Sequence, residues 1–220
     1  QLDFSGADSV TTVLDANGHV ISYTDAYSSL ISTTSTSTVT SYSVNGFYDD
    51  SVNGWRTVDA TFDLTSYITS SATIEFIFSV NSASSPGFNF DLYDNLQRII
   101  EFNDFWLNIG GRGLGADKSI NTRIGQDRPT IWSPFVLERK YHVFITMTNL
   151  DTTTTTRTVF ARDMVDSTEY NYSDTITTSS SKQLHIGNPT RYGSNISPNN
   201  NDNIVFYMVK VRDYEYSGSS

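Results

Sequence analysis

The sequence predicts an all-β protein, a two-sheet antiparallel β-sandwich of the jelly-roll type. Apolar and polar residues alternate with a period of two in many short runs, which is typical of strands with one buried face. Clusters of Gly, Asn, Asp, Ser and Pro separate these runs, and no helical period extends beyond two turns. The 220 residues are enough for one domain with a sizeable core.

Each predicted strand places one set of side chains on its buried face. In chain order these sets are Val58, Ala60, Phe62 and Leu64; Ile74, Phe76, Phe78 and Val80; Phe88, Phe90 and Leu92; Phe105, Trp106, Leu107 and Ile109; and Tyr141, Val143, Ile145 and Met147. A last run, residues 204–211, is apolar on both faces and predicts a central strand. We expect Phe76, Phe78, Val143, Ile145, Phe206 and Met208 to lie between the two sheets. The Ser/Thr-rich stretches 28–43 and 152–158 adjoin apolar alternation and predict exposed hairpins.

The composition predicts one domain over residues 1–216, with a linker or expression tail over 217–220. Acidic residues outnumber basic ones by 24 to 14, and the formal charge of −10 argues against nucleic-acid binding. No apolar stretch reaches the roughly 18 to 20 residues of a membrane helix, so no membrane insertion is expected. The absence of cysteine excludes disulfides, thiolate metal sites and a cysteine nucleophile.

Five segments carry a family pattern in a fixed order. They are residues 2–10 (LDFSGADSV), 73–79 (TIEFIFS), 141–146 (YHVFIT), 183–188 (QLHIGN) and 202–213 (DNIVFYMVKVRD). Together they resemble the laminin-G-like branch of the concanavalin A-like lectin and glucanase superfamily, with Phe78 and Tyr141 at positions where that family has Trp. The resemblance implies a jelly roll, and the family consists mostly of non-catalytic binding modules on extracellular, cell-surface or virion proteins.

No catalytic pattern in the sequence is complete. A glycosidase needs two carboxyl groups near one another. Glu75 has no acidic residue two positions away on its strand, so it would have to meet Glu101 across neighbouring strands. The lyases of the superfamily carry strand motifs with Arg, Gln and His and a Tyr base, a set not recognised in this chain. The three histidines are dispersed, at His19, His142 and His185. We therefore predict that the chain is not an enzyme.

A sugar site combines an aromatic ring with planar polar side chains. Trp55 with Asp50 and Asn53 is the first candidate, and core packing of the indole is the alternative. The further candidates are Trp106 with Asn108 and Arg112, and Tyr192 between Arg191 and Asn195. Asp49, Asp50 and Asn53 also form an oxygen-rich turn that predicts a calcium site, unless they serve only the turn itself.

These observations lead to a ranked set of functions. The first is a lectin-like module that binds a glycan or a cell-surface glycoconjugate, as part of a larger secreted, cell-surface or virion protein. The alternative is a structural or protein-binding domain that forms a homo-oligomer through the parent protein. The third is a polysaccharide-cleaving enzyme.

Overall fold

The structure is a computed structural model, and it describes residues 12–14, 20–22, 32–33, 40–49, 51–81, 97–102, 105–109, 120–123, 130–132, 136–177, 182–187 and 204–215. All regular elements in these ranges are strands, as the sequence predicts. None of the described segments is a helix that could cross a membrane. The strand predicted around Phe88, Phe90 and Leu92 lies outside the described residues.

Fifteen strands are described. They are β1 (Thr12–Leu14), β2 (Val20–Ser22), β3 (Ser32–Thr33), β4 (Thr40–Asp49), β5 (Gly54–Asp63), β6 (Ser71–Val80), β7 (Gln97–Phe102), β8 (Phe105–Ile109), β9 (Ile120–Arg123), β10 (Thr130–Trp132), β11 (Tyr141–Thr148), β12 (Thr154–Asp163), β13 (Glu169–Thr177), β14 (Gln183–Gly187) and β15 (Ile204–Arg212).

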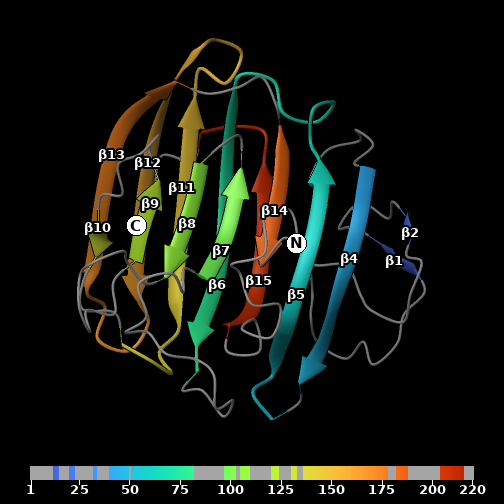
Figure 1. The fold of residues 1–220 in the computed structure, drawn as a ribbon, viewed down its shortest axis with the longest axis vertical. Coiled ribbons are helices and arrows are strands. Elements are labelled where there is room, and N and C mark those ends of the chain that lie inside the picture. Colours follow the sequence, from blue (N-terminus) through green and yellow to red (C-terminus); the bar gives the residue numbers. More distant parts are fainter. Residues whose placement is uncertain are drawn as a thin grey trace.

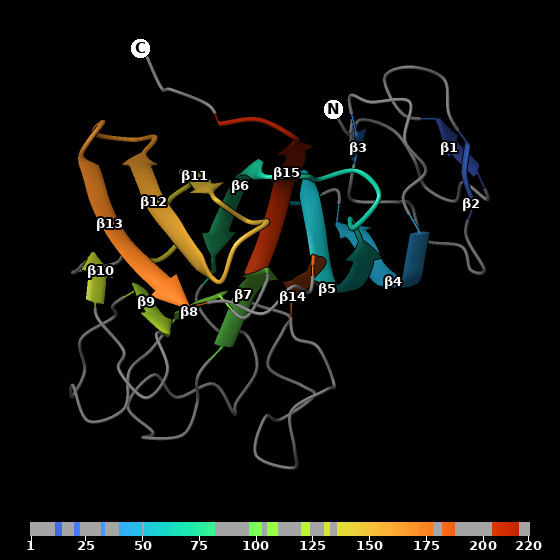
Figure 2. The ribbon, with the colours of Figure 1, turned by 90° about the horizontal axis from the view of Figure 1, so that it is seen from above.

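Thirteen of these strands form one hydrogen-bonded sheet that folds into two layers (Figures 1 and 2), and eleven of them follow one another along a single path. We call β10-β9-β8-β7-β14 the front layer and β15-β6-β11-β12-β13 the back layer. Strand β5 joins them, because it pairs with β14 along one part and with β15 at Trp55. Strand β4 pairs with β5, β3 pairs with β15 in parallel, and β1 and β2 pair only with each other in the described chain. The arrangement is the predicted sandwich.

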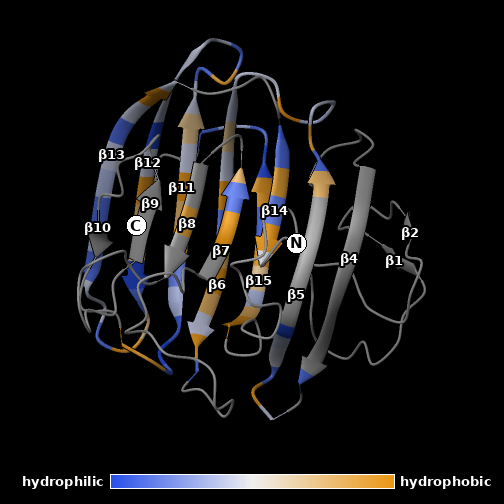
Figure 3. Ribbon diagram, viewed as in Figure 1, coloured by the Kyte–Doolittle hydropathy of each residue, from blue (hydrophilic) through white to orange (hydrophobic). Residues whose placement is uncertain are grey.

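The core lies between the layers. Phe76, Phe78, Val143, Ile145 and Phe206 are almost completely buried, which confirms their prediction. The front layer contributes apolar side chains of its own, namely Ile100, Phe102, Leu107, Leu184 and Ile186. Figure 3 shows hydrophobic residues along the central strands and mostly hydrophilic ones along the edge strand β13.

Met208 is the exception among the predicted core residues. A bulge in β15 shifts its register against β6, so Phe206 pairs with Phe78 but Met208 pairs with Ile77. The extra residue reverses the alternation, and Val209 and Val211 become fully buried in place of Met208, which is only partly buried. The prediction for Met208 is wrong because a strict period of two cannot anticipate a bulge.

The Thr-rich stretch 152–158 is the predicted hairpin. The turn between β11 and β12 contains Asn149 at a φ of 62°, and the following residues enter β12. The alternate residues Thr154 and Thr158 are exposed, whereas Thr155 and Arg157 face the interior.

Candidate active site

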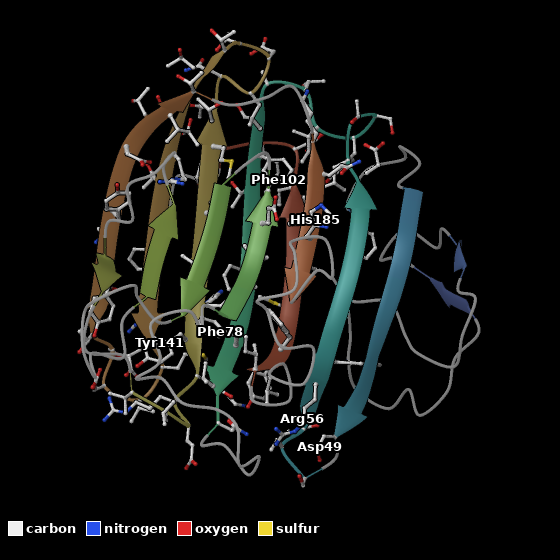
Figure 4. The ribbon with its side chains drawn as sticks, in the orientation of Figure 1. Asp49, Arg56, Phe78, Phe102, Tyr141 and His185 are labelled. Carbon is white, nitrogen blue, oxygen red and sulfur yellow. The ribbon has the colours of Figure 1, made fainter. Side chains whose placement is uncertain are left out.

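Glu101 and His185 stand side by side on the front layer. Strands β7 and β14 are antiparallel neighbours, and their register pairs Glu101 with His185. The flanking residues Leu184 and Ile186 belong to the core, so the alternation directs His185 to the opposite, outer face of the layer. Each of the two ionisable side chains is nonetheless only 4% exposed. Figure 4 labels His185 beside Phe102, the register partner of Leu184.

Gln183 shares this face with His185, because the two lie at alternate positions of β14. Its register partner on β5 is Asp63, and Thr61 is the partner of His185. Gln183 and Asp63 are both partly exposed. A Gln-x-His pattern within an apolar strand therefore places an amide and an imidazole together, next to the Glu101 carboxyl group.

Two predicted ligand residues lie on the adjacent strand β8. Trp106 is the register partner of Glu101, and Asn108 is the partner of Arg98. On the far side of β8, Trp106 pairs with Arg123 of β9. The register thus places Trp106 and Arg123 in one row with Glu101 across β7, β8 and β9.

Sequence reasoning missed Glu101, His185 and Gln183 as one group. The signal was present, since polar residues at alternate positions of an otherwise apolar strand must share one face. Their proximity, however, depends on β14 lying beside β7, although some eighty residues separate these strands in the sequence. No local pattern predicts that pairing.

Glu75 does not approach Glu101. Its strand β6 pairs with β11 and β15 in the back layer, not with β7. Glu75 Oε1 is 2.8 Å from His142 Nε2, and Oε2 accepts a hydrogen bond from Arg212. Burial favours the neutral acid, but these partners prevail and lower the pKa of Glu75 to about 2. Glu75 and Glu101 therefore do not form a catalytic pair, and Glu75 stays ionised within an ion-pair cluster.

In the predicted calcium turn, the carboxylate of Asp49 is occupied by hydrogen bonds from neighbouring protein groups. Asp49 Oδ1 accepts hydrogen bonds from the Ser51 amide at 2.9 Å and hydroxyl at 2.6 Å, and Arg56 Nε donates to Oδ2 at 2.5 Å. The Ser51 hydroxyl and the Arg56 guanidinium lower the pKa of Asp49, although burial of the carboxyl group acts in the opposite direction. A guanidinium at this carboxylate opposes a second cation. The described residues contain no group of three or more potential His, Cys, Asp or Glu metal ligands.

Of the other predicted ligand residues, Trp55 and Asn53 lie at the β4–β5 turn. Trp55 is 2% exposed and pairs with the core residue Phe206. Its indole therefore packs in the core, as the alternative prediction has it, and is not an exposed stacking platform. Asn53 is exposed, with a φ of 54° in the β4–β5 turn. Figure 4 shows Asp49 and Arg56 of this turn at the lower end of the molecule, well below His185. Asp50, Arg112 and Tyr192 lie outside the described residues.

Comparisons with known proteins bear on the fold. No protein-family model matches the chain. No curated protein matches it in sequence. Among solved structures, the alginate lyase Aly36B is similar, with a TM-score of 0.51, 10% identity, and coverage of 81% of this chain and 88% of that chain.

Two further solved structures are less similar. A PL-14 alginate lyase from Aplysia kurodai has a TM-score of 0.43 and 8% identity, with 80% of this chain and 82% of that chain covered. A bifunctional GH43-CE protein of Bacteroides eggerthii has a TM-score of 0.44 and 8% identity, with 71% of this chain covered. The match spans only 20% of that bifunctional chain.

The fold is a concanavalin A-like jelly-roll sandwich, and the narrower laminin-G-like assignment stays a prediction. The prediction that the chain is not an enzyme is corrected. It depended on a family made up mostly of binding modules, whereas the similar sandwich of Aly36B is that of an alginate lyase. Among the strand carboxylates, the sequence also suggested Glu75 as the partner of Glu101, whereas Glu101 pairs with His185.

Proposed function

We propose that the chain is a polysaccharide-cleaving enzyme that acts at the outer face of the front layer, around Glu101, His185 and Gln183. The observation that carries the proposal is a carboxyl group and an imidazole held next to each other on the face opposite the core, each only 4% exposed. Such a pair is suited to proton transfer, because histidine accepts and donates protons near neutral pH. The sandwich shared with the alginate lyase Aly36B supports a polysaccharide as substrate.

The reaction we propose is β-elimination from a uronic-acid residue. A base removes the proton α to the substrate carboxylate, the electron pair forms a carbon–carbon double bond, and the glycosidic carbon–oxygen bond breaks. The leaving oxygen takes up a proton, so the reaction balances without water or a cofactor. His185 is assigned as the base, while Glu101 orients its ring and Gln183 hydrogen-bonds the substrate carboxylate. Hydrolysis by paired carboxylates fits less well, since Glu75 lies in the other layer.

An acidic substrate fits the basic residues of the front layer. Arg98 of β7 and Arg123 of β9 occupy register positions opposite Asn108 and Trp106. We infer from these strand positions that the two arginines help to attract an acidic substrate to a chain whose net charge is −10. An extracellular or surface location, predicted from the sequence, suits an enzyme of this kind and is part of the proposal. Calcium stays a prediction, to be tested by whether EDTA lowers the melting temperature.

The test uses alginate, polygalacturonate and hyaluronan as substrates. The wild-type protein is expected to release products with the ultraviolet absorbance of a double bond conjugated to a carboxylate. We expect His185→Gln to reduce this rate by about 100-fold or more, the usual effect of removing a general base. The matched control is His142→Gln, which changes the histidine of the back layer and is expected to retain the wild-type rate.

Two results would overturn the proposal. One is the absence of unsaturated product from all three polymers. The other is a His185→Gln protein that melts like the wild type and retains full activity. Because His185 is buried, melting curves of both variants accompany the rates, and Glu101→Gln provides a second probe. We expect Glu101→Gln to lower the rate and to shift the pH dependence of the rate. If Glu101 had a purely structural role, the pH dependence would stay the same.

A further inference from the structure

The outer face of the back layer carries a second feature, far from Glu101 and His185. Phe144 of β11 and Phe160 of β12 are register partners, and both are partly exposed. Their ring centroids are 6.1 Å apart with an interplanar angle of 53°. The neighbouring residues Val143 and Ala161 are fully buried, so the two rings lie on the face that points away from the core.

Rows of hydroxyl groups flank the two rings. On one side the register aligns Thr146, Thr158 and Ser173, and the next row aligns Thr148, Thr156 and Thr175. The hydroxyl groups of Thr158 and Ser173 are 3.2 Å apart. The exposed Asn171 continues the row of the rings on β13, as the partner of Phe160. We call Phe144, Phe160, Asn171 and these two rows the back-layer platform.

The chemistry of the platform limits what can bind there. The two hydroxyl rows contain no charged side chain, although the whole chain carries a net charge of −10. The β-branched threonines are stiff and lose little freedom when a ligand binds. Aromatic faces suit the apolar faces of sugar rings, and hydroxyl and amide groups suit sugar hydroxyls. Beside the rings, Glu75 is the register partner of Phe144, and Arg162 and Glu169 are partners in the row on the other side, so the charges there are of both signs and give an acidic polymer no net attraction. The net charge of −10 repels such a polymer at long range.

We propose that the back-layer platform binds a neutral polysaccharide and holds the protein on it. The surface lies in the layer opposite the proposed catalytic site, so binding there leaves Glu101 and His185 open to a different chain. The inference does not depend on the cleavage reaction. It assigns to the solvent face of the back layer an attachment role that is separate from catalysis.

The experiment is electrophoresis in native gels that contain laminarin, galactomannan or xylan, with alginate as the acidic comparison. The wild-type protein is expected to be retarded by at least one neutral polymer. We expect the Phe144→Ala/Phe160→Ala double variant to lose about tenfold or more in affinity, as two aromatic contacts are removed. Tyr214→Ala is the matched control, because it removes a half-exposed aromatic side chain that is not part of the platform.

The outcomes separate this inference from the proposed cleavage. His185→Gln should bind the neutral polymer like the wild type, and the double Phe variant should retain elimination activity on short uronate oligosaccharides. The inference is overturned if no neutral polymer retards the wild-type protein, or if the double variant is retarded equally. It is also overturned if the double variant abolishes a concentration-dependent dimer, because a second copy of the chain then occupies the platform.

Discussion

Glu75 shows how a carboxylate on the outer face of the back layer becomes a fixed charge. Burial raises the pKa of a carboxyl group, yet His142 and Arg212 lower that of Glu75 from 4.5 to about 2. Because the pKa is lower in the folded protein, the cluster stabilises the fold fully above the unfolded pKa of 4.5. This stabilisation fades as the pH falls through the interval down to about 2.

We therefore predict that Glu75→Gln lowers the free energy of unfolding by about 2 to 3 kcal/mol at neutral pH. The difference from the wild type should shrink steadily between about pH 5 and about pH 2, where the wild-type carboxylate takes up a proton. Urea unfolding at a series of pH values measures it. Glu169→Gln, a change at an exposed glutamate of β13, is the control and should cost little at any pH. A loss that is independent of pH would show that packing, not charge, stabilises this position.

At the scale of elements, β5 and β15 approach one another closely at Gly54. A Cβ atom at Gly54 would lie 2.4 Å from Val205 Cγ1 and 3.0 Å from Tyr207 Cε1. Only glycine allows β15 to approach so closely while Trp55 fills the core beside it. The join of β5 and β15 brings the front and back layers into one path, so its geometry affects both.

We predict that Gly54→Ala costs about 1 to 3 kcal/mol, the usual effect of overpacking. Val205→Ala also costs stability because it leaves a cavity, but it removes the atom nearest to the new methyl group. The double variant should therefore be more stable than the sum of the two single effects predicts. Thermal unfolding of the four proteins measures this coupling. Simple additivity would mean that the strand shifts instead of clashing with the new side chain.

At the scale of the whole molecule, both layers share a single core. Phe76 and Phe78, with ring centroids 5.6 Å apart, face the front-layer residues of the same cluster. We predict that Phe76→Ala lowers the free energy of unfolding by about 3 to 5 kcal/mol. Circular dichroism and tryptophan fluorescence should show coincident transitions in both the variant and the wild type, because neither layer has a core of its own. Two separate transitions would indicate layers that unfold independently.

The fold class follows from local patterns, and the candidate site does not. The alternation over residues 141–147 correctly identifies which residues of β11 are buried, since strand faces depend only on a period of two. The same reasoning fails at Met208, where a bulge intervenes. Glu101 and His185 meet only through the pairing of β7 with β14, and Glu75 is separated from Glu101 because β6 pairs elsewhere. Strand order is a property of the complete sandwich, so residue patterns within single strands do not contain it.

The position of β15 has a consequence for how the protein is made. Among the described strands β15 comes last in the sequence, yet it lies inside the path, between β6 on one edge and β5 and β3 on the other. During synthesis, the earlier strands leave the ribosome with this central gap unfilled, and β5 and β6 then expose unpaired edges. Folding must wait for the last strand, and such non-local pairing is slow. Newly made chains should therefore depend on chaperones until residues 204–212 emerge, and truncation before this strand should yield aggregates instead of a smaller folded domain.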